Sequence, residues 1–435
     1  MAGMMAAGEP DSAAPAGGDP PVGYELRVLI LLGLAFGFAY FDRMAMTFLA
    51  PFVVEDLSLS NTEVGALGSG LSLTWALGAY FVGRWSDSLG ARKPFLLAAL
   101  VIFSFCSVMS GLAWNFGSLF AARLVMGAAE GPFLPICLAI MAVASAEGRK
   151  GLNAGVVQNV FGSILGTALA PIVLVWLAET FGWREAFYIA GIPGLVLALL
   201  IWRFVHEPPR APDDAKSPAR DAGGLAALLR AELATVRRFL SERNVLLCSI
   251  ISCFAVGSAV IGSIFMPLYL DGPLGIEPAT WKYMMAVVGL CPAVGALLFT
   301  AMSDRIGRKP PMIIGGTLMA LGPLGLLLVD GDAIVLTALM FVGWMGMGIF
   351  PLFMGVVPAE TLGRAGAATA MGLVVAVGEL SGGVFGPIVA GSLADSFSLD
   401  FALWLQAGLA VAGGATALAL AETNARVLAR RAAAT

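Results

Sequence analysis

The sequence predicts an all-α membrane protein with twelve transmembrane helices, arranged as two pseudo-symmetric bundles of six. The first observation behind this prediction is composition: 59% of the 435 residues are hydrophobic, 12% are charged, and the mean hydropathy is +0.88. The second is a series of twelve apolar segments of about 20 residues or more, the length that a helix needs to cross a bilayer. The third is a loop pattern that occurs once in each half of the chain.

Composition also excludes several classes of protein. The net charge of -4 is small and predicts no nucleic-acid partner. The single histidine, His206, and five cysteines that all lie in apolar runs offer neither a metal site nor a histidine-based catalytic group. With no nucleophile motif or cofactor loop either, we expect no enzyme activity, no metal and no cofactor.

The chain divides into five parts. Residues 1–24 are rich in Ala, Gly and Pro and are expected to form a disordered cytoplasmic N-terminus. The two bundles are expected at 25–205 and 244–421, and a cytoplasmic tail at 422–435. Between the bundles, residues 206–243 begin as a Pro-rich linker and continue with apolar residues at helical spacing opposite arginines. That pattern predicts an amphipathic helix on the membrane surface, or a simple tether between the bundles.

Each bundle contains six expected segments. Those of the first bundle are 26–50, 62–83, 94–113, 115–142, 151–177 and 183–205. Those of the second bundle are 244–270, 279–302, 310–329, 333–357, 365–393 and 399–421. Pro132 and Pro135 predict a kink in the fourth segment, because proline removes a helical hydrogen bond.

The positions of the basic residues predict the orientation. Of the 25 Lys and Arg residues, two lie inside segments, and only Arg184 and Lys282 fall in odd-numbered connections. The others lie in even-numbered connections, at the base of the first segment or in the C-terminal tail. Because basic loops stay on the cytoplasmic side, we expect a multi-pass inner-membrane protein with both termini in the cytoplasm.

A polar loop pattern follows the second and the eighth segments. Its residues are Gly83, Asp87, Gly90, Arg92 and Lys93 in the first copy, and Asp304, Gly307, Arg308 and Lys309 in the second. Asp87 and Asp304 are 217 residues apart, and Pro171 and Pro387 recur at an offset of 216, which indicates a duplication. The glycine permits a tight turn, while the charged residues can cap helix ends and pair across the bundle interface.

Twelve segments in two sixes, a central linker and the repeated loop resemble the major facilitator superfamily, over nearly the whole chain after residue 24. The resemblance implies that the loop acts as a cytoplasmic latch, with Asp87, Arg92 and Lys93 in the first copy and their counterparts in the second. The second copy departs from the family pattern, because Thr300 replaces the leading glycine.

Three features further resemble the anion:cation symporters, which move organic anions such as sugar acids, often with protons. They are Tyr40-x-Asp42-Arg43, the spacing from Arg123 to Glu130, and the Gly-x-Arg-Lys form of the loop. Members of that family use the corresponding acids for proton coupling and the arginines for substrate binding. The spinster-like transporters of lipids share the first two spacings, so they are a second resemblance.

Asp42, Arg43, Arg123 and Glu130 also stand out physically, because a charge at membrane depth costs roughly 2.5–3.5 kcal/mol. At 1.5 Å per residue, Asp42 and Arg123 both lie about 12 Å below the outer surface and can face each other. Arg43 then faces the cavity, and Glu130 lies two turns from Arg123 with no arginine in its own turn. We assign substrate binding to the arginines and proton coupling to the acids. The alternative is a static Asp–Arg pair with Glu130 bonded to backbone or water.

Four further residues are weaker candidates. Tyr80 either adds a hydroxyl to the cavity or is an interfacial aromatic residue. Gln158 and Asn159 either contact substrate or hold helices together. Glu379 is the only acid deep in the second bundle and is a candidate proton site or substrate contact, with no basic partner in its own bundle.

These residues predict a secondary active transporter that moves a small organic anion together with a proton by alternating access. The proton is the expected coupling ion, and the protein is expected to be a monomer in the lipid bilayer. One alternative is an exporter of lipids or amphipathic compounds, because the second bundle is nearly free of charge. Another is a non-transporting membrane sensor, although the sequence carries no appended signalling domain.

Overall fold

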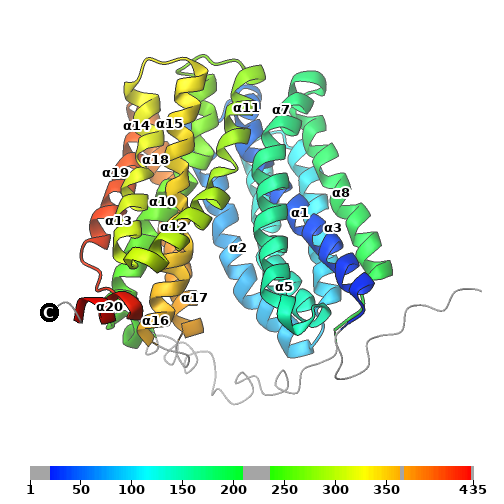
Figure 1. The fold of residues 1–435 in the computed structure, drawn as a ribbon. Helices are drawn as coiled ribbons and strands as arrows, with labels where there is room; N and C mark the ends of the chain where they lie inside the picture. The colour runs from blue at the N-terminus through cyan, green and yellow to red at the C-terminus, as the bar shows by residue number, and fades with distance from the viewer. Residues whose placement is uncertain (1–19, 209–235, 363–366, 433–435) are drawn as a thin grey trace, which may run out of the picture.

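The computed structural model describes residues 20–208, 236–362 and 367–432, and these residues form helices joined by short connections. Figure 1 shows two groups of helices side by side, one coloured blue to green and the other green to red. We call them the N-terminal and the C-terminal bundle. Of the linker, residues 209–235 lie outside the described part, and the described end of the expected amphipathic helix is helical over 236–240.

The N-terminal bundle is built from segments that run alternately up and down, some of them divided into several helical elements. They are α1 (Val22–Leu57), α2 (Asn61–Leu89), α3 (Lys93–Gly111), α4 (Phe116–Glu130), α5 (Phe133–Ala144), η1 (Glu147–Arg149), α6 (Lys150–Gly155), η2 (Val156–Leu169), α7 (Ala170–Phe181) and α8 (Trp183–Phe204). The fourth expected segment is divided into α4 and α5 at Pro132, which confirms the predicted kink. The middle of the fifth segment, η2, is wound as a π-helix.

The C-terminal bundle repeats this arrangement. Its elements are α10 (Arg243–Asp271), α11 (Pro278–Val288), α12 (Cys291–Ile306), α13 (Lys309–Leu318), α14 (Leu321–Leu328), α15 (Ala333–Met345), η5 (Gly346–Ile349), η6 (Leu352–Val356), α16 (Val357–Leu362), α17 (Ala367–Gly378), η7 (Glu379–Phe385), α18 (Gly386–Ser396), α19 (Asp400–Ala417) and α20 (Ala425–Ala432). Here η7 is a π-helical stretch in the eleventh segment, the counterpart of η2 in the fifth.

Ten helical stretches in the described residues are long and apolar enough to cross a membrane. Helices α2 and α19 pack among them, so the architecture agrees with the twelve expected segments. The expected and observed bounds differ by only a few residues. The clearest differences are α1, which continues to Leu57, and α2, which continues to Leu89. Both helices extend beyond their apolar stretch because a helix does not have to end where the hydrocarbon ends.

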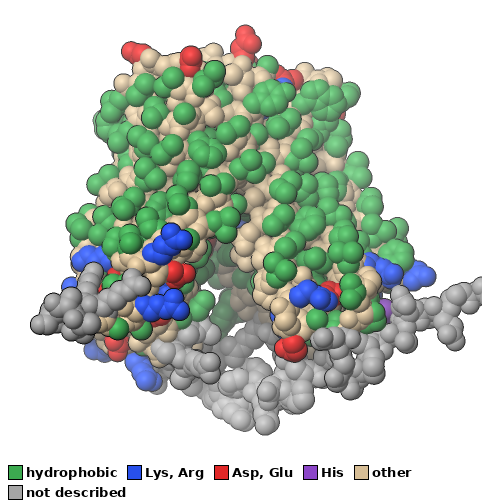
Figure 2. Space-filling view, in the orientation of Figure 1, with side chains coloured by type: hydrophobic (Ala, Val, Ile, Leu, Met, Phe, Trp, Pro, Cys, Tyr) green, Lys and Arg blue, Asp and Glu red, His purple; other side chains and the backbone are tan. Residues whose placement is uncertain are grey.

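The two ends of the molecule differ in charge. Figure 2 shows acidic side chains along the top and Lys and Arg side chains along the bottom. We call the top, with connections 58–60, 272–277 and 330–332, the acidic end. The bottom, where α1 begins and α20 lies, is the basic end.

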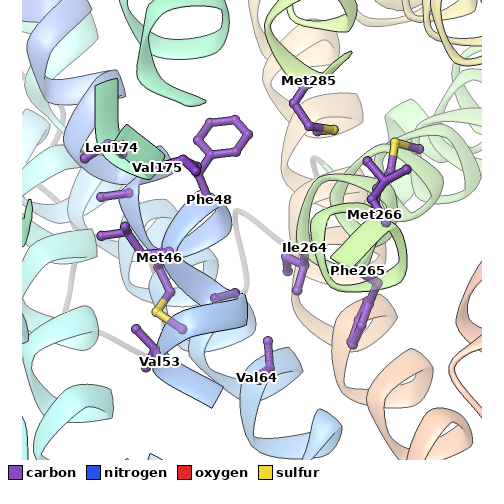
Figure 3. Packing of buried hydrophobic residues seen from close by; sticks show 14 of the residues in the cluster. Met46, Phe48, Val53, Val64, Leu174, Val175, Ile264, Phe265, Met266 and Met285 are labelled. Atoms are coloured by element: carbon purple, nitrogen blue, oxygen red, sulfur yellow. The ribbon is translucent and has the colours of Figure 1, made fainter. Parts of the chain in front are cut away.

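At the acidic end the two bundles pack tightly against each other. A single cluster of buried hydrophobic residues contains Met46, Phe48 and Val64 of the N-terminal bundle together with Ile264 and Met285 of the C-terminal bundle. Figure 3 shows these side chains on the two sides of the interface. Burial of this apolar surface holds the acidic end closed.

Polar contacts reinforce this closure. The Asp395 carboxylate at the end of α18 accepts hydrogen bonds from the backbone N–H groups of Asn61 and Thr62, both at 2.8 Å. An aspartate of one bundle therefore caps the first turn of α2 in the other bundle. Lys282 of α11 pairs with Glu179 of α7, also across the interface, at 2.6 Å.

At the basic end the bundles separate. Figure 2 shows the molecule hollowed between the two bundles there, below the packed acidic end. The fold is therefore closed at one end and open at the other, which is the geometry of one state of an alternating-access carrier.

Candidate functional site: a charged cavity between the bundles

A cavity of about 200 Å³ lies between the bundles. Its N-terminal wall carries the guanidinium groups of Arg43 and Arg123 and the hydroxyl groups of Tyr40, Thr47 and Ser72, beside the apolar residues Met44, Met46, Ala50, Val64, Leu67 and Leu71. The C-terminal wall is mainly apolar and consists of Val256, Ala259, Val260, Ser263, Ile264, Met347, Phe350 and Glu379. Two cations on one wall and apolar surface on the other suit a small molecule with an anionic group and an apolar body or edge.

Arg43 is the cavity arginine on α1. It is partly exposed, and its guanidinium carbon lies 5.3 Å from the centre of the Trp75 ring of α2. This cation–π contact orients the guanidinium without using all of its hydrogen-bond donors. Among the described residues its N–H groups have no hydrogen-bond partner, so they can bind a ligand in the cavity that Arg43 lines.

Arg123 on α4 is almost completely buried, with 1% of its surface exposed. Its Nη1 donates to the sulfur of Met126 at 3.3 Å, but Nε and Nη2 have no hydrogen-bond partner among the described residues. Its guanidinium carbon also lies 5.3 Å from the centre of the Phe187 ring. A buried guanidinium with unused donors is costly unless an anion completes it.

Asp42 does not form the direct ion pair with Arg123 that the sequence suggested. The carboxylate is fully buried, and its Oδ1 accepts a hydrogen bond from Ser107 of α3 at 2.6 Å, while Oδ2 has no partner among the described residues. Asp42 and Arg123 are close enough to interact electrostatically. The static Asp–Arg pair that we considered as an alternative is therefore absent from this conformation.

Glu130 is the last residue of α4 and is 5% exposed. Its Oε1 has no hydrogen-bond partner among the described residues. The charges that act on it most strongly are those of Arg43, Asp42 and Arg123, so the four charged residues singled out in the sequence form one electrostatic cluster.

Glu379 reaches this cluster from the other bundle. It is the first residue of the π-helical η7 and lines the cavity, and Arg43 is its main electrostatic neighbour. The sequence had shown no basic partner for it because the partner belongs to the N-terminal bundle. Arg43 is therefore influenced by an acid of each bundle, Glu130 and Glu379. Irregular helical turns of this kind are frequent at functional sites.

The match to known proteins fits this geometry. A model of the Major Facilitator Superfamily matches residues 32–374 and 248–434. The chain belongs to the Major Facilitator Superfamily. It is 32% identical to the hexuronate transporter of Bacillus subtilis, over 43% of each chain, so that match spans under half of the relative's length. It is 24% identical to the D-galactonate transporter of Escherichia coli, over 92% of this chain and 96% of that one.

Solved structures of the superfamily share the fold. A bacterial homologue of the lysosomal transporter Spinster, in an inward-facing and unoccupied conformation, matches with a TM-score of 0.70. The identity is 20%, and the match covers 92% of this chain and 95% of that one. The hexuronate and D-galactonate relatives are transporters, and membership of their superfamily, with ten helices long and apolar enough to cross a membrane among the described residues, makes the chain a multi-pass membrane protein.

The first copy of the superfamily loop makes a tight turn at the basic end. Gly90 has a φ of 61°, a left-handed conformation that favours glycine. The backbone N–H groups of Arg92 and Lys93 donate to the carboxylate of Glu207 at 2.5 and 2.8 Å. Gly83 lies in α2, and no atom lies within 4 Å of where its Cβ would be. Asp87 also belongs to α2, but its side chain is outside the described part.

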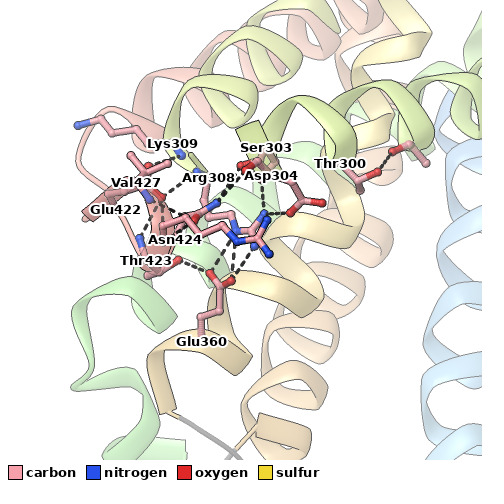
Figure 4. A network of polar contacts seen from close by, with 12 residues as sticks. Thr300, Ser303, Asp304, Arg308, Lys309, Glu360, Glu422, Thr423, Asn424 and Val427 are labelled. Carbon is pink, nitrogen blue, oxygen red and sulfur yellow. Dashed lines mark hydrogen bonds and ion pairs between the residues drawn. The ribbon is translucent and has the colours of Figure 1, made fainter. Parts of the chain in front are cut away.

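The second copy of the loop is the counterpart of the first (Figure 4). Gly307 has a φ of 104°, and the N–H groups of Arg308 and Lys309 donate to the carboxylate of Glu422 at 2.8 and 3.4 Å. Glu422 follows Glu207 by 215 residues, which adds another pair to the internal repeat.

The side chains of the second copy make their ion pairs within their own bundle. Arg308 pairs with Asp304 at 2.6 Å and with Glu360 of α16 at 2.7 Å (Figure 4). These contacts do not bridge the bundles. The latch implied by the family resemblance therefore remains a prediction, for a state in which the basic end is closed.

Three predicted substrate contacts do not reach the cavity in this conformation. Tyr80 is 47% exposed and packs edge-on against Phe81, while Gln158 and Asn159 are exposed on η2. None of the three lines the cavity described above. A helix that is apolar on every side gives no periodic signal for which side faces the cavity.

Sequence reasoning missed three important residues. Ser107 donates a hydrogen bond to the buried carboxylate of Asp42, and the ring of Trp75 forms the cation–π contact with Arg43. Asp395 joins the bundles at the acidic end. Serines and tryptophans are common in membrane helices, so neither type stood out. Asp395 lies in an expected connection, where nothing in the sequence indicates its partner in the other bundle.

Proposed function

We propose that this chain is a proton-coupled symporter of small organic anions, which carries carboxylates or sugar acids across the inner membrane by alternating access. The observation that carries this proposal is Arg123, a buried guanidinium at the cavity with Nε and Nη2 unpaired. With Arg43 on the same wall, it offers a carboxylate the forked donors that recognise such groups best.

The size of the cavity supports a small substrate. Its volume of about 200 Å³ is below the roughly 300–1,000 Å³ of pockets that hold drug-sized ligands. The names of the relatives support the same chemistry, because hexuronate and D-galactonate are both sugar acids.

Proton coupling is assigned to Asp42, Glu130 and Glu379. All three are acids inside the membrane-spanning region, where an ionisable residue is a functional candidate by default. Two of them, Glu130 and Glu379, share the electrostatic influence of Arg43 from opposite bundles. When a substrate anion neutralises Arg43, both acids lose a stabilising positive charge, so substrate binding favours proton binding.

The charge distribution sets the proposed orientation. Lys and Arg side chains gather at the basic end, so we place that end, with α20 and the start of α1, in the cytoplasm. The hollow then opens inward, and Asp395 and the Lys282–Glu179 pair close the outer side. We propose that a single chain in the lipid bilayer is the working unit, since each chain encloses its own cavity.

A second candidate function is transport of lipids or amphipathic compounds. It is favoured by the apolar C-terminal wall of the cavity, where Ser263 and Glu379 are the only polar lining residues among the described ones. An amphipathic molecule could place its head group on the arginines and its tail on this wall. The cavity in the present state is small for such a molecule.

A thermal-shift screen of the purified protein separates the two functions. A ligand that binds the folded state raises the melting temperature by mass action. We expect stabilisation by sugar acids and small carboxylates, and none by the matching neutral sugars. Stabilisation by lysolipids alone would refute the anion proposal. Uptake into proteoliposomes with and without an imposed pH gradient then tests coupling for each ligand that binds.

A further inference from the structure

Ser107 occupies a position between two hydrogen-bond acceptors. It lies in α3, is fully buried, and its Oγ is 2.6 Å from Asp42 Oδ1 of α1 and 2.8 Å from the carbonyl oxygen of Phe187 of α8. One hydroxyl group therefore connects three helices of the N-terminal bundle beside the proposed anion site.

A serine hydroxyl has one hydrogen to donate. The carbonyl oxygen of Phe187 can only accept, and an ionised carboxylate can only accept, so Ser107 cannot bond to both at once. When Asp42 carries a proton, its O–H donates to Ser107, and Ser107 donates to Phe187. Both short distances are then hydrogen bonds. Loss of the proton leaves one of the two contacts without a hydrogen.

We propose that Ser107 is a positioning residue that transmits the protonation state of Asp42 to α8. With Asp42 protonated, an ordered chain of hydrogen bonds runs from Asp42 through Ser107 to the Phe187 carbonyl. With Asp42 ionised, the hydroxyl turns to the carboxylate, because hydrogen bonds to charged groups are the stronger ones, and its bond to α8 is lost. This inference rests on the proposed proton coupling at Asp42.

Rotation of the Ser107 hydroxyl affects other groups, because Asp42 has several ionisable neighbours. Arg123 and Glu130 approach from α4 and the Cys106 thiol from α3, and these are its ionisable neighbours among the described residues. Phe187 of α8 contributes its ring to Arg123 and its carbonyl to Ser107. A change in the bond from Ser107 to α8 therefore affects Phe187, whose ring lies against the Arg123 guanidinium.

The packing of α3 on α8 leaves Ser107 little freedom except to rotate its hydroxyl. A Cβ at Gly191 of α8 would lie 2.8 Å from the Ser104 carbonyl oxygen and 3.2 Å from Ser107 Cβ. This close approach of the two backbones brings the Phe187 carbonyl within reach of Ser107. The helices stay packed when the bond is lost, so only the orientation of the hydroxyl group changes.

The test compares Ser107→Ala with Ser110→Ala. Ser110 is a matched control, because it lies one turn further along α3, is equally buried, and donates only within its own helix, to the Cys106 carbonyl at 2.8 Å. In Ser107→Ala the ionised form of Asp42 loses more than the neutral form. The pH midpoint of substrate counterflow should move upward by about half to one pH unit. Ser110→Ala should leave it in place, and Ser107→Cys, with a weaker donor, should give a smaller shift.

Infrared difference spectroscopy gives a readout that needs no transported substrate. The carbonyl-stretch band of protonated Asp42 is identified by its loss in Asp42→Asn, and its intensity is followed against pH. In Ser107→Ala we expect the band at higher frequency, because a hydrogen bond is lost, and its midpoint at higher pH. An unchanged band and midpoint, or equal changes in Ser110→Ala, would overturn the proposal. Failure of every organic anion to bind would refute the proposed substrate and leave this test intact.

Discussion

The two bundles differ in the charged side chains that they bury. In the N-terminal bundle, Asp42, Arg123 and Glu130 are at most 5% exposed, and each keeps at least one atom without a hydrogen-bond partner among the described residues. In the C-terminal bundle, Arg308 lies at the basic end and has two carboxylate partners, Asp304 and Glu360. The N-terminal bundle also pairs charges at its surface, as in Arg184–Asp56, so the difference is that it buries incomplete charges as well.

This difference separates groups kept for transport from groups kept for stability. An unpaired buried charge costs several kcal/mol, so its presence needs a reason other than folding. In the described residues of the C-terminal bundle, the buried atoms without partners belong to Ser252 and Gln406, which are uncharged. Glu379 is the charged residue of that bundle that lines the cavity, and its main electrostatic neighbour is Arg43 of the N-terminal bundle.

Substitution of the two cavity arginines tests this difference between the bundles most directly. Arg123→Ala should lower the affinity for a carboxylate substrate by about 30- to 5,000-fold, because losing one partner of a buried charged contact costs about 2–5 kcal/mol. Arg43→Ala should have a similar effect, and lysine at either position should restore binding only in part. Calorimetric titration measures these affinities. Arg184→Ala, which removes a surface pair with Asp56 at the acidic end, is the control and should bind normally. Wild-type affinity in both cavity variants would contradict the anion proposal.

The second effect in size is expected at Glu130. Glu130→Gln imitates the protonated acid, so it should exchange substrate across the membrane and lose accumulation driven by a pH gradient. Asp42→Asn should do more damage, because it also removes a charge near Arg123. Counterflow and net uptake in proteoliposomes measure the two activities, with the surface variant Glu63→Gln as the control. Undiminished accumulation by Glu130→Gln would move the coupling role to Asp42 or Glu379.

The sequence predicted more of the fold than of the site. The helical segments and their approximate bounds could be predicted because length and hydropathy determine them. The break at Pro132 could be predicted because proline removes a helical hydrogen bond. The depth of Arg123 and Glu130 could be estimated by counting residues along a helix. Which neighbour each one contacts could not, because that depends on helix rotation and on contacts between bundles. The partner of Asp42 is Ser107 and the main electrostatic neighbour of Glu379 is Arg43, and neither pairing follows from spacing along one helix.

A smaller effect should appear where the bundles meet. Asp395→Ala removes the cap that the C-terminal bundle provides to α2, and a lost cap costs about 1–2 kcal/mol. The equilibrium should shift by about 5- to 30-fold toward opening of the acidic end. A cysteine at Val64, buried in that interface, should then react faster with an impermeant maleimide in a background without the native cysteines. Asp332→Ala is the matched control, because Asp332 caps α15 within its own bundle. Equal rates in the two variants would contradict a role for Asp395 in closure.

The smallest effect is expected at Glu422, which belongs to the paired charges of the basic end. Burial raises the pKa of its carboxyl, but the backbone N–H groups of Arg308, Asn424, Lys309 and Thr423 outweigh it and hold the pKa below its ordinary value of 4.5. The ionised form therefore stabilises the fold above pH 4.5, and that contribution is lost as the pH falls through the lowered pKa. Because the group is partly exposed, the loss in melting temperature on acidification should be at most about 2–4 °C. Glu422→Gln should lower the melting temperature at neutral pH and should show less of the acid-induced loss. A variant as acid-sensitive as the wild type would show that these backbone donors do not stabilise the loop, and the contrast between the bundles would then rest on Arg308 alone.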